Sequence, residues 1–192
     1  LAFSPDDTRL LILDEDMGVQ AWDFEKRQLE RLLPEVRDRR HFKSEVIFSP
    51  DARRLAVSEG GQVRVLDLAT GAELARMQAF EQNVAAMAFS PDGSILAASP
   101  LFTDVSTTIK LFSTASGQEL GRLVGHASWV PGLTFTADGE RLISVGADQT
   151  LRVWDTASQT ELNRLHGHLS EVYCVDVTPD GKTIISGCKD GT

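Results

Sequence analysis

Short runs in which apolar and polar residues alternate follow one another along the chain, separated by clusters of turn residues. A period of two indicates β-strands that bury one face, and it excludes an array of amphipathic helices. The pattern also repeats. The sequence FSPD occurs at Phe3, Phe48 and Phe89, and the related FTAD and VTPD begin at Phe135 and Val177. Spacings of 45, 41, 46 and 42 residues therefore define five copies of one structural unit.

Each unit is expected to contain four strands. The first ends at the FSPD phenylalanine, and the Pro and Gly of the following turn favour the backbone angles of a hairpin. The second strand carries an aliphatic residue seven positions later, and the third ends with an aromatic residue or leucine. The fourth has the pattern L-x-R-[LM], which begins at Leu29, Leu74, Leu120 and Leu162. We expect its arginines on the outer, solvated edge.

Four antiparallel strands repeated at this period favour sheets that pack radially as blades and bury their faces against one another. The predicted fold is all-β, a β-propeller of four-stranded antiparallel blades that forms an open arc. It comprises one domain, 1–192, with units at about 1–42, 43–83, 84–128 and 129–170 and an incomplete unit at 171–192.

Residues at matching offsets resemble the WD-repeat (WD40) family. Trp22-Asp23 and Trp154-Asp155 end third strands, and Gly125-His126 and Gly167-His168 precede first strands. The FSPDG turn with TG-x-x-L at Thr70 is similar to bacterial members. The resemblance covers the entire chain and implies a propeller, commonly of seven or eight blades.

The resemblance also implies a buried hydrogen-bond network in each complete blade. It joins a Gly-His histidine, a second-strand serine or threonine, an aspartate of the next turn and the third-strand tryptophan. The members present in the fourth, fifth and first units are His126, Ser144, Asp148 and Trp154; His168, Ser186 and Asp190; and Asp16 and Trp22. The first unit has Ile12 at the serine position, and Leu66 and Phe112 replace tryptophan in the second and third. Those blades are expected to rely on apolar packing.

Two constellations could carry chemistry. Ser144, His126 and Asp148 could form a catalytic triad, but a nucleophile needs an exposed Oγ, and the resemblance places Ser144 inside a blade. Cys174 and Cys188 with His168 could bind a metal, but no pair has zinc-ligand spacing. We therefore expect a structural network, two small buried cysteines, no catalytic residue, no metal and no cofactor.

Two connections are four residues longer than their counterparts, and variable loops on a fixed scaffold often bind partners. From Leu32 to Phe48 there are 16 residues instead of 12, and from Leu96 to Phe112 there are 16 instead of 11 or 12. In antiparallel units both loops share one end. The resemblance implies that each fourth strand packs outside the next repeat, which would make the insertions neighbours.

The insertions pair basic with apolar residues, which predicts a protein-binding site. The candidates are Arg37, Arg39, Arg40, Phe42 and Lys43 in the first loop and Leu101 and Phe102 in the second. The alternative is a solvated charged loop beside a loop folded onto its own blade.

Charge and composition exclude several classes of function. The 28 acidic residues exceed 19 Lys and Arg, a net charge of −9 that disfavours nucleic-acid binding. No run of 18 apolar residues predicts a membrane span. Two cysteines and no visible signal peptide indicate a reducing compartment, so we expect a soluble cytoplasmic protein.

The strand count predicts an excerpt of a longer chain. If each fourth strand packs on the next repeat, the first blade lacks its outer strand, and the last contains two strands only. Closing a ring at this period takes roughly 300 residues, so the rest of the propeller is expected from the same chain; a self-assembling half propeller is the alternative.

The predicted function is a non-catalytic protein-protein interaction scaffold or sensor within a larger bacterial signalling protein. The alternative is a propeller domain that gates or carries a hydrolase site, because FSPDG turns also occur in such propellers. The chain contains no G-x-S-x-G and no P-loop, which favours the scaffold.

Overall fold

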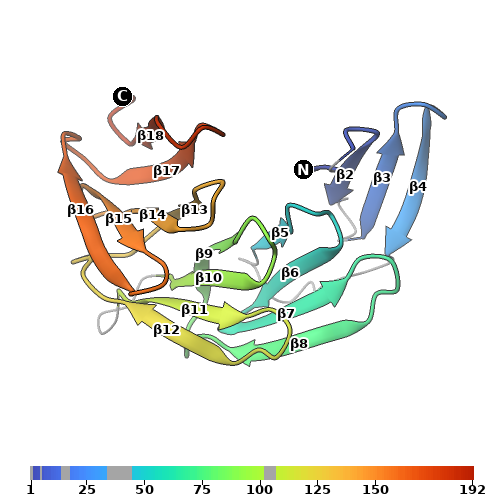
Figure 1. The fold of residues 1–192 in the computed structure, drawn as a ribbon, viewed down its shortest axis with the longest axis horizontal. Helices are drawn as coiled ribbons and strands as arrows, with labels where there is room; N and C mark the ends of the chain where they lie inside the picture. The colour runs from blue at the N-terminus through green and yellow to red at the C-terminus, as the bar shows by residue number, and fades with distance from the viewer. Residues whose placement is uncertain (1, 5, 14–17, 34–44, 102–106) are drawn as a thin grey trace.

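Antiparallel β-sheets form the entire described fold of this computed structural model, which covers residues 2–4, 6–13, 18–33, 45–101 and 107–192 (Figure 1). Within these ranges there are 18 strands in five sheets. The same residues include no helix of the length and apolarity that crossing a membrane requires.

Each of the first four sheets contains four strands from one continuous stretch of sequence. The first sheet comprises β1 (Ala2–Phe3), β2 (Arg9–Leu13), β3 (Val19–Asp23) and β4 (Gln28–Leu33). The second comprises β5 (Val46–Phe48), β6 (Arg54–Glu59), β7 (Gln62–Asp67) and β8 (Glu73–Gln78). The third comprises β9 (Val84–Phe89), β10 (Ile95–Pro100), β11 (Ile109–Ser113) and β12 (Glu119–Leu123). The fourth comprises β13 (Gly132–Phe135), β14 (Arg141–Val145), β15 (Thr150–Asp155) and β16 (Thr160–His166), and the fifth pairs β17 (Val172–Val177) with β18 (Ile184–Cys188).

The order of strands corrects one expectation. Each fourth strand pairs with the third strand of its own unit, as β4 does with β3 and β8 with β7, and not with the next repeat. The first sheet therefore has its outer strand, contrary to the prediction that this strand would be lacking. Short connections explain the pairing, because a tight turn between β7 and β8 leaves them adjacent and antiparallel.

The sheets follow one another along an arc (Figure 1). Strands β5, β9, β13 and β17 lie on its concave side, where β9 and β13 contact each other and β13 contacts β17. Strands β4, β8, β12 and β16 form the outer rim. This arrangement is the predicted open arc of propeller blades.

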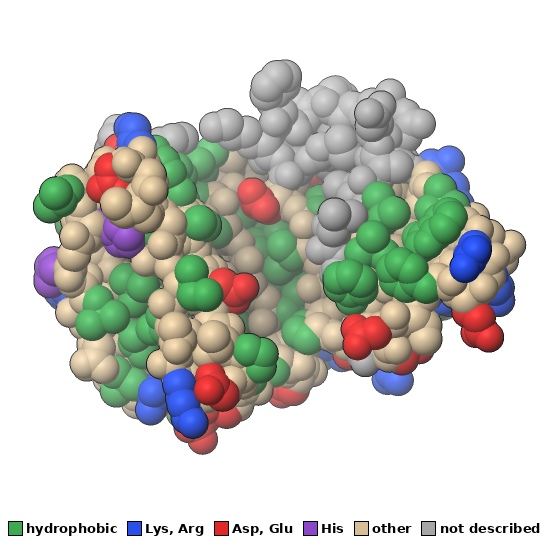
Figure 2. Space-filling model, turned by 90° about the horizontal axis from the view of Figure 1, so that it is seen from above, with side chains coloured by type: hydrophobic (Ala, Val, Ile, Leu, Met, Phe, Trp, Pro, Cys, Tyr) green, Lys and Arg blue, Asp and Glu red, His purple; other side chains and the backbone are tan. Residues whose placement is uncertain are grey.

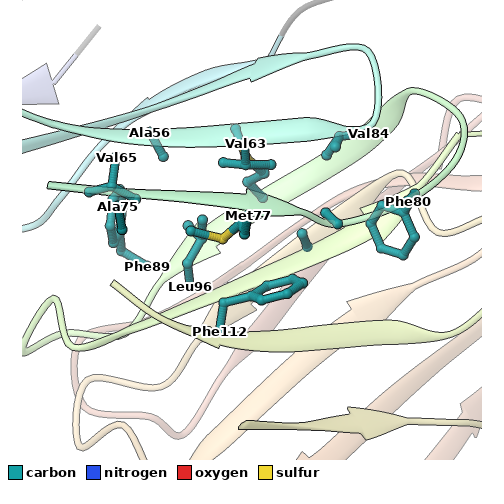
Figure 3. Close-up of a cluster of buried hydrophobic side chains, with 13 residues drawn as sticks. Ala56, Val63, Val65, Ala75, Met77, Phe80, Val84, Phe89, Leu96 and Phe112 are labelled. Atoms are coloured by element: carbon teal, nitrogen blue, oxygen red, sulfur yellow. The ribbon is translucent and has the colours of Figure 1, made fainter. Parts of the chain in front are cut away.

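Four apolar clusters fill the spaces between successive sheets. Between the second and third sheets, Val63, Val65 and Met77 face Leu96 and Phe112 (Figure 3). Strand residues alternate between two clusters, so that one face of a sheet packs on the preceding sheet and the other on the following one. This packing is the source of the period-two pattern.

Hydrogen bonds from turn residues fix the hairpins. In each hairpin, an aspartate in the turn accepts a hydrogen bond from the hydroxyl of the preceding Ser or Thr. Asp92 accepts from Ser90 over 2.6 Å, and Asp138 accepts from Thr136 over 2.5 Å. The same aspartates accept backbone N–H groups, such as that of Ser94. The side chains of the FSPD motif therefore satisfy the hydrogen-bonding groups of their own turn.

The outer strands pair their arginines within the strand. Arg76 with Glu73 and Arg164 with Glu161 form ion pairs at 2.7 and 2.9 Å, and the two arginine side chains are 50% and 46% exposed. Arg122 pairs with Glu119 in the same way. The predicted solvated edge is thus charged on every repeat from the second to the fourth.

The outward faces of the first and fifth sheets expose hydrophobic side chains, which are seen from above in Figure 2. Phe3 stacks on Phe24 with ring centroids 6.3 Å apart, and the two residues are 60% and 44% exposed. The expectation of buried cysteines is wrong. Cys174 is exposed and Cys188 half-buried, because among the described residues the fifth sheet consists of two strands and no other sheet covers its outer face.

Candidate interaction surface

A buried chain of polar side chains links the connection between β12 and β13 to strands β14 and β15. Nε2 of His126 lies 2.7 Å from Ser144 Oγ, and Nδ1 lies 2.9 Å from Oδ2 of Asp148. The indole N–H of Trp154 donates to the same Ser144 Oγ over 2.8 Å. With the histidine proton assigned to Nδ1, the indole N–H donates to Ser144 Oγ, the Ser144 hydroxyl donates to His126 Nε2, and His126 Nδ1–H donates to the Asp148 carboxylate. The structure thus brings together all four residues that the family resemblance singled out in the fourth unit.

Asp148 is ionised in this environment. Burial acts to raise its pKa, but hydrogen bonds from His126, the N–H of Ala127 and the hydroxyl of Thr150 outweigh that effect, so the pKa lies well below its usual range. Arg152, whose side chain is 3% exposed, lies 3.5 Å from the same carboxylate and 2.6 Å from Glu161. The network therefore balances its buried charges.

This geometry opposes a catalytic role for Ser144. The residue is 0% exposed, and its oxygen is shared between two buried ring nitrogens. A substrate carbonyl could not approach the hydroxyl without opening the sheet. The Ser, His and Asp of this unit join a connection, a strand and a turn.

The fifth sheet repeats only part of the arrangement. His168 Nε2 lies 2.8 Å from Ser186 Oγ, matching the fourth sheet. Its Nδ1, however, lies 3.2 Å from the hydroxyl of Thr192, and Asp190 accepts from that residue over 2.6 Å. The fifth sheet thus differs from the fourth in that the histidine Nδ1 contacts a threonine hydroxyl instead of the aspartate.

The other units pack without the complete network. Leu66 and Phe112, in the tryptophan position, are 5% and 2% exposed, which agrees with the expected apolar packing. Trp22 is 36% exposed on the outward face of the first sheet. Asp16 lies outside the described residues.

The two long connections leave the same end of the sheets, because antiparallel order places every connection between sheets and every turn between second and third strands there. Of the predicted binding residues, Arg37, Arg39, Arg40, Phe42, Lys43 and Phe102 lie outside the described residues. Leu101 is described: it is half-buried, and its N–H donates to Asn83 O over 2.7 Å. It lines a hollow of about 410 Å³ with Glu81, Gln82 and Asn83. We call the end of the sheets that carries these connections and turns the loop end; the four residues that line the hollow lie there.

An aromatic pair at the loop end was not predicted from the sequence. Trp129, from the connection between β12 and β13, packs against Tyr173 of β17 with ring centroids 5.9 Å apart. The Tyr173 hydroxyl donates to Glu171, which also pairs with Lys189 at 3.2 Å. The sequence feature that could have predicted this pair is Trp129 itself, because a tryptophan in a connection lies outside the alternating pattern of the strands.

Comparisons with known proteins agree with this geometry. The family model described as WD domain, G-beta repeat matches residues 71–113, 117–155 and 159–192. The first two matches each begin before the outer strand of one sheet and end at the third strand of the next. The family repeat is thus offset by one strand from the sheets.

A curated relative and a solved structure show what the chain is similar to. An uncharacterized WD repeat-containing protein of Synechocystis sp. (strain ATCC 27184 / PCC 6803 / Kazusa), sll1491, is 33% identical over 104 residues, which cover 53% of this chain and 28% of the relative. A chain in the crystal structure of the mitotic checkpoint complex superposes with a TM-score of 0.78 at 23% identity, over 97% of this chain and 55% of that chain. The second likeness shows a shared fold.

The chain therefore spans about a quarter of the curated relative and about half of the structural one. Proteins built on WD40 propellers are generally protein-interaction scaffolds. The family match over more than half of the chain, the blade geometry and the His-Ser-Asp-Trp network together show that this chain belongs to the WD40 repeat family.

Proposed function

We propose that this chain is a non-catalytic protein-interaction scaffold or sensor module of a larger bacterial signalling protein that acts in the cytoplasm. Membership of the WD40 family supports a protein partner, and the net charge of −9 disfavours nucleic acid. The cyanobacterial relative, of which the chain matches 28%, supports a bacterial origin and a longer whole.

The observation that carries this proposal is the loop end. It combines a hollow beside Leu101, the aromatic pair of Trp129 and Tyr173, and the starting points of both long connections. Exposed Glu45 and Glu81 add negative charge. Aromatic anchors within a polar rim are the usual composition of protein-binding surfaces. The opposite end carries turn aspartates whose hydrogen bonds are used within their own turns.

Capture of proteins from a lysate of the source organism, quantified by mass spectrometry, tests the site. Leu101→Ala combined with Gln82→Ala should remove a partner that the unmodified chain retains. Glu140→Ala, in an exposed turn at the opposite end, is the matched control and should leave capture unchanged. Arg40→Ala with Phe102→Ala extends the test to the two insertions. Equal capture by all variants, at equal melting temperatures, would reject the loop end as the binding site.

The proposal of a larger protein has its own test. The exposed apolar faces of the first and fifth sheets are of the kind that successive sheets bury elsewhere in the arc, so we propose that further blades of the same chain cover them. The intact mass of the native polypeptide decides the point. A mass well above the 21.0 kDa of these residues is expected, and a mass equal to it would overturn this part of the proposal.

A further inference from the structure

A pocket lies between the first and second sheets, at the end of the sheets opposite the loop end. Its volume is about 580 Å³, which is in the range of ligand pockets. Leu11, Leu32 and Leu68 form part of its wall, and turn residues of both sheets complete it. The two sheets are neighbours in the arc, and each has all four strands (Figure 1). A blade that covered the outward face of the first sheet would therefore leave the pocket open.

The next interface along the arc shows which side chain occupies the equivalent place. Arg54 of β6 and Arg9 of β2 have the same position in their sheets, six residues after the FSPD phenylalanine. The Arg54 guanidinium crosses to the third sheet, where its Nη1 donates to the backbone oxygen of Gly93 and to Thr114 Oγ1, the latter over 3.0 Å. An arginine side chain thus occupies the space between the second and third sheets.

Arg9 does not cross to the second sheet in this way. It lies 3.7 Å from Asp23 and 3.8 Å from Glu30 of its own sheet, and its side chain is 37% exposed. In the second sheet Ala75 takes the place of Glu30, so this second carboxylate is lacking beside Arg54. The ion pairs of the first sheet therefore hold Arg9 away from the space that Arg54 fills at the next interface.

The facing wall of the pocket differs as well. Leu68 follows β7 at the place where Thr114 follows β11, so a leucine side chain replaces the hydroxyl that accepts from Arg54. The backbone oxygen of Ala52 takes the place of that of Gly93, because both residues stand fifth from the FSPD phenylalanine, counted inclusively, and have positive φ of 51° and 70°. The wall thus keeps a carbonyl acceptor for a guanidinium but does not attract the arginine of the first sheet.

Three carboxylates line the pocket. They belong to Asp6, Asp51 and Asp67, and the lining also includes Arg9 and Arg53. The aspartates accept hydrogen bonds within their turns through Oδ1, and these bonds do not use Oδ2. Because Arg9 is already paired with two carboxylates of its own sheet, the lining has an excess of negative charge. Leucine walls and carboxylates together match arginine, whose stem is apolar and whose guanidinium is a cation with several donors.

We propose that this pocket binds an arginine side chain that projects from a polypeptide segment of a protein partner. The stem packs against the leucine walls, and the guanidinium donates to the carboxylates and to Ala52 O, as that of Arg54 donates to Gly93 O at the next interface. A free amino acid fits less well, because its α-carboxylate would meet the aspartates, whereas a peptide main chain carries no charge. The pocket is a second binding site, separate from the loop end.

Surface plasmon resonance with the native polypeptide tests the proposal. The probes are immobilised seven-residue peptides of glycine, serine and alanine with a central arginine or a central citrulline, which keeps the shape of arginine and removes its charge. We expect the arginine peptide to bind and the citrulline peptide to bind about tenfold or more weakly. In competition, N-acetyl-arginine amide should displace the protein better than free L-arginine does. Equal displacement by the two would overturn the assignment to a polypeptide segment.

Asp51→Asn combined with Asp67→Asn removes two of the carboxylates. This variant should weaken binding of the arginine peptide about tenfold or more, because the guanidinium loses two charged acceptors. Asp138→Asn, at the position equivalent to Asp51 in the fourth sheet, is the matched control and should bind normally.

Glu30→Ala combined with Leu68→Thr reproduces the interface between the second and third sheets, so that Arg9 crosses as Arg54 does. The filled pocket should no longer bind the peptide although its aspartates remain, and adding Arg9→Ala should restore binding. Circular dichroism and melting temperature verify that each variant is folded. An arginine peptide that does not bind, or that binds the filled variant unchanged, would overturn the site. The loop-end variants should bind the peptide normally, so failure of one site is distinguishable from failure of the other.

Discussion

The indole N–H of Trp154 donates a hydrogen bond to Ser144 Oγ over 2.8 Å, and both residues are almost completely buried. The same oxygen lies 2.7 Å from Nε2 of His126. Ser144 is therefore the shared partner of two rings that come from different parts of the unit. Its removal affects two hydrogen bonds, whereas the removal of the Trp154 indole N–H affects one.

Ser144→Ala should destabilise the chain more than Trp154→Phe. The alanine leaves the indole N–H and the imidazole nitrogen without their buried partner, at a cost of about 2 to 4 kcal/mol in the free energy of unfolding, whereas the phenylalanine removes one donor and keeps most of the packing. Urea unfolding followed by fluorescence and circular dichroism measures both. Ser116→Ala, in an exposed turn, is the control. Equal losses for the two buried variants would show that the shared hydroxyl contributes nothing beyond the indole hydrogen bond.

Asp148 should make the chain sensitive to acid. Because its folded-state pKa lies below the unfolded value of about 3.9, its carboxylate contributes stability that is fully present above that value and is lost as the pH falls toward the folded-state pKa. Asp148→Asn should therefore flatten the fall of unfolding free energy below about pH 4.

Asp92 provides the comparison for this measurement. Hydrogen bonds from Ser90 and Ser94 lower its pKa to about 2, but the carboxylate is exposed. Asp92→Asn should flatten the same curve less, because solvent screens its interactions. An acid limb that is unchanged in Asp148→Asn would contradict the assignment of a stabilising buried carboxylate.

Gly61 is expected to tolerate no side chain. A Cβ there would lie 2.0 Å from the backbone oxygen of Phe80 and 2.6 Å from that of Gln82, so Gly61→Ala must displace the chain between the second and third sheets. We expect a loss of about 1 to 3 kcal/mol. Gly167→Ala is matched, since nothing lies within 4 Å of its Cβ, and it should be neutral or slightly stabilising. Thermal unfolding of the two variants side by side checks this, and similar melting temperatures would be the contrary result.

The third sheet allows the network to be rebuilt in part. Phe112 occupies the tryptophan position and Ala98 the serine position, and both face the same cluster. Phe112→Trp alone should destabilise, because its N–H is buried without an acceptor. Adding Ala98→Ser supplies the acceptor. The free energy of unfolding of the double variant should therefore be about 1 kcal/mol higher than the sum of the two single changes predicts. Strict additivity in the double-mutant cycle would contradict the equivalence of the two sheets.

The repeated pattern was sufficient to predict much of this fold. Alternation, the FSPD turns and the leucine and tryptophan positions each depend on residues a few positions apart, and hairpin strands pair locally. The structure also brings together the fourth-unit members of the network, which a recurring family motif places at fixed offsets from those strands. The arginines of the outer strands were placed on the solvated edge for the same reason.

Other features needed the tertiary structure. The pairing of the strand with the arginine pattern was predicted wrongly from the sequence. In the structure this strand pairs with the third strand of its own unit across a short turn, as β8 does with β7. The sequence analysis grouped Cys188 with Cys174 and His168, whereas in the described residues the cluster that includes Cys188 is formed with His168 and Asp190.

The sequence by itself thus determined the strands, the turns and the family of this protein, because backbone propensity and hairpin pairing act over short distances. Only the tertiary structure decided which strand each fourth strand pairs with and which aromatic residues meet at the loop end. The aromatic contact joins residues from different units, and its geometry depends on how successive sheets pack around the arc.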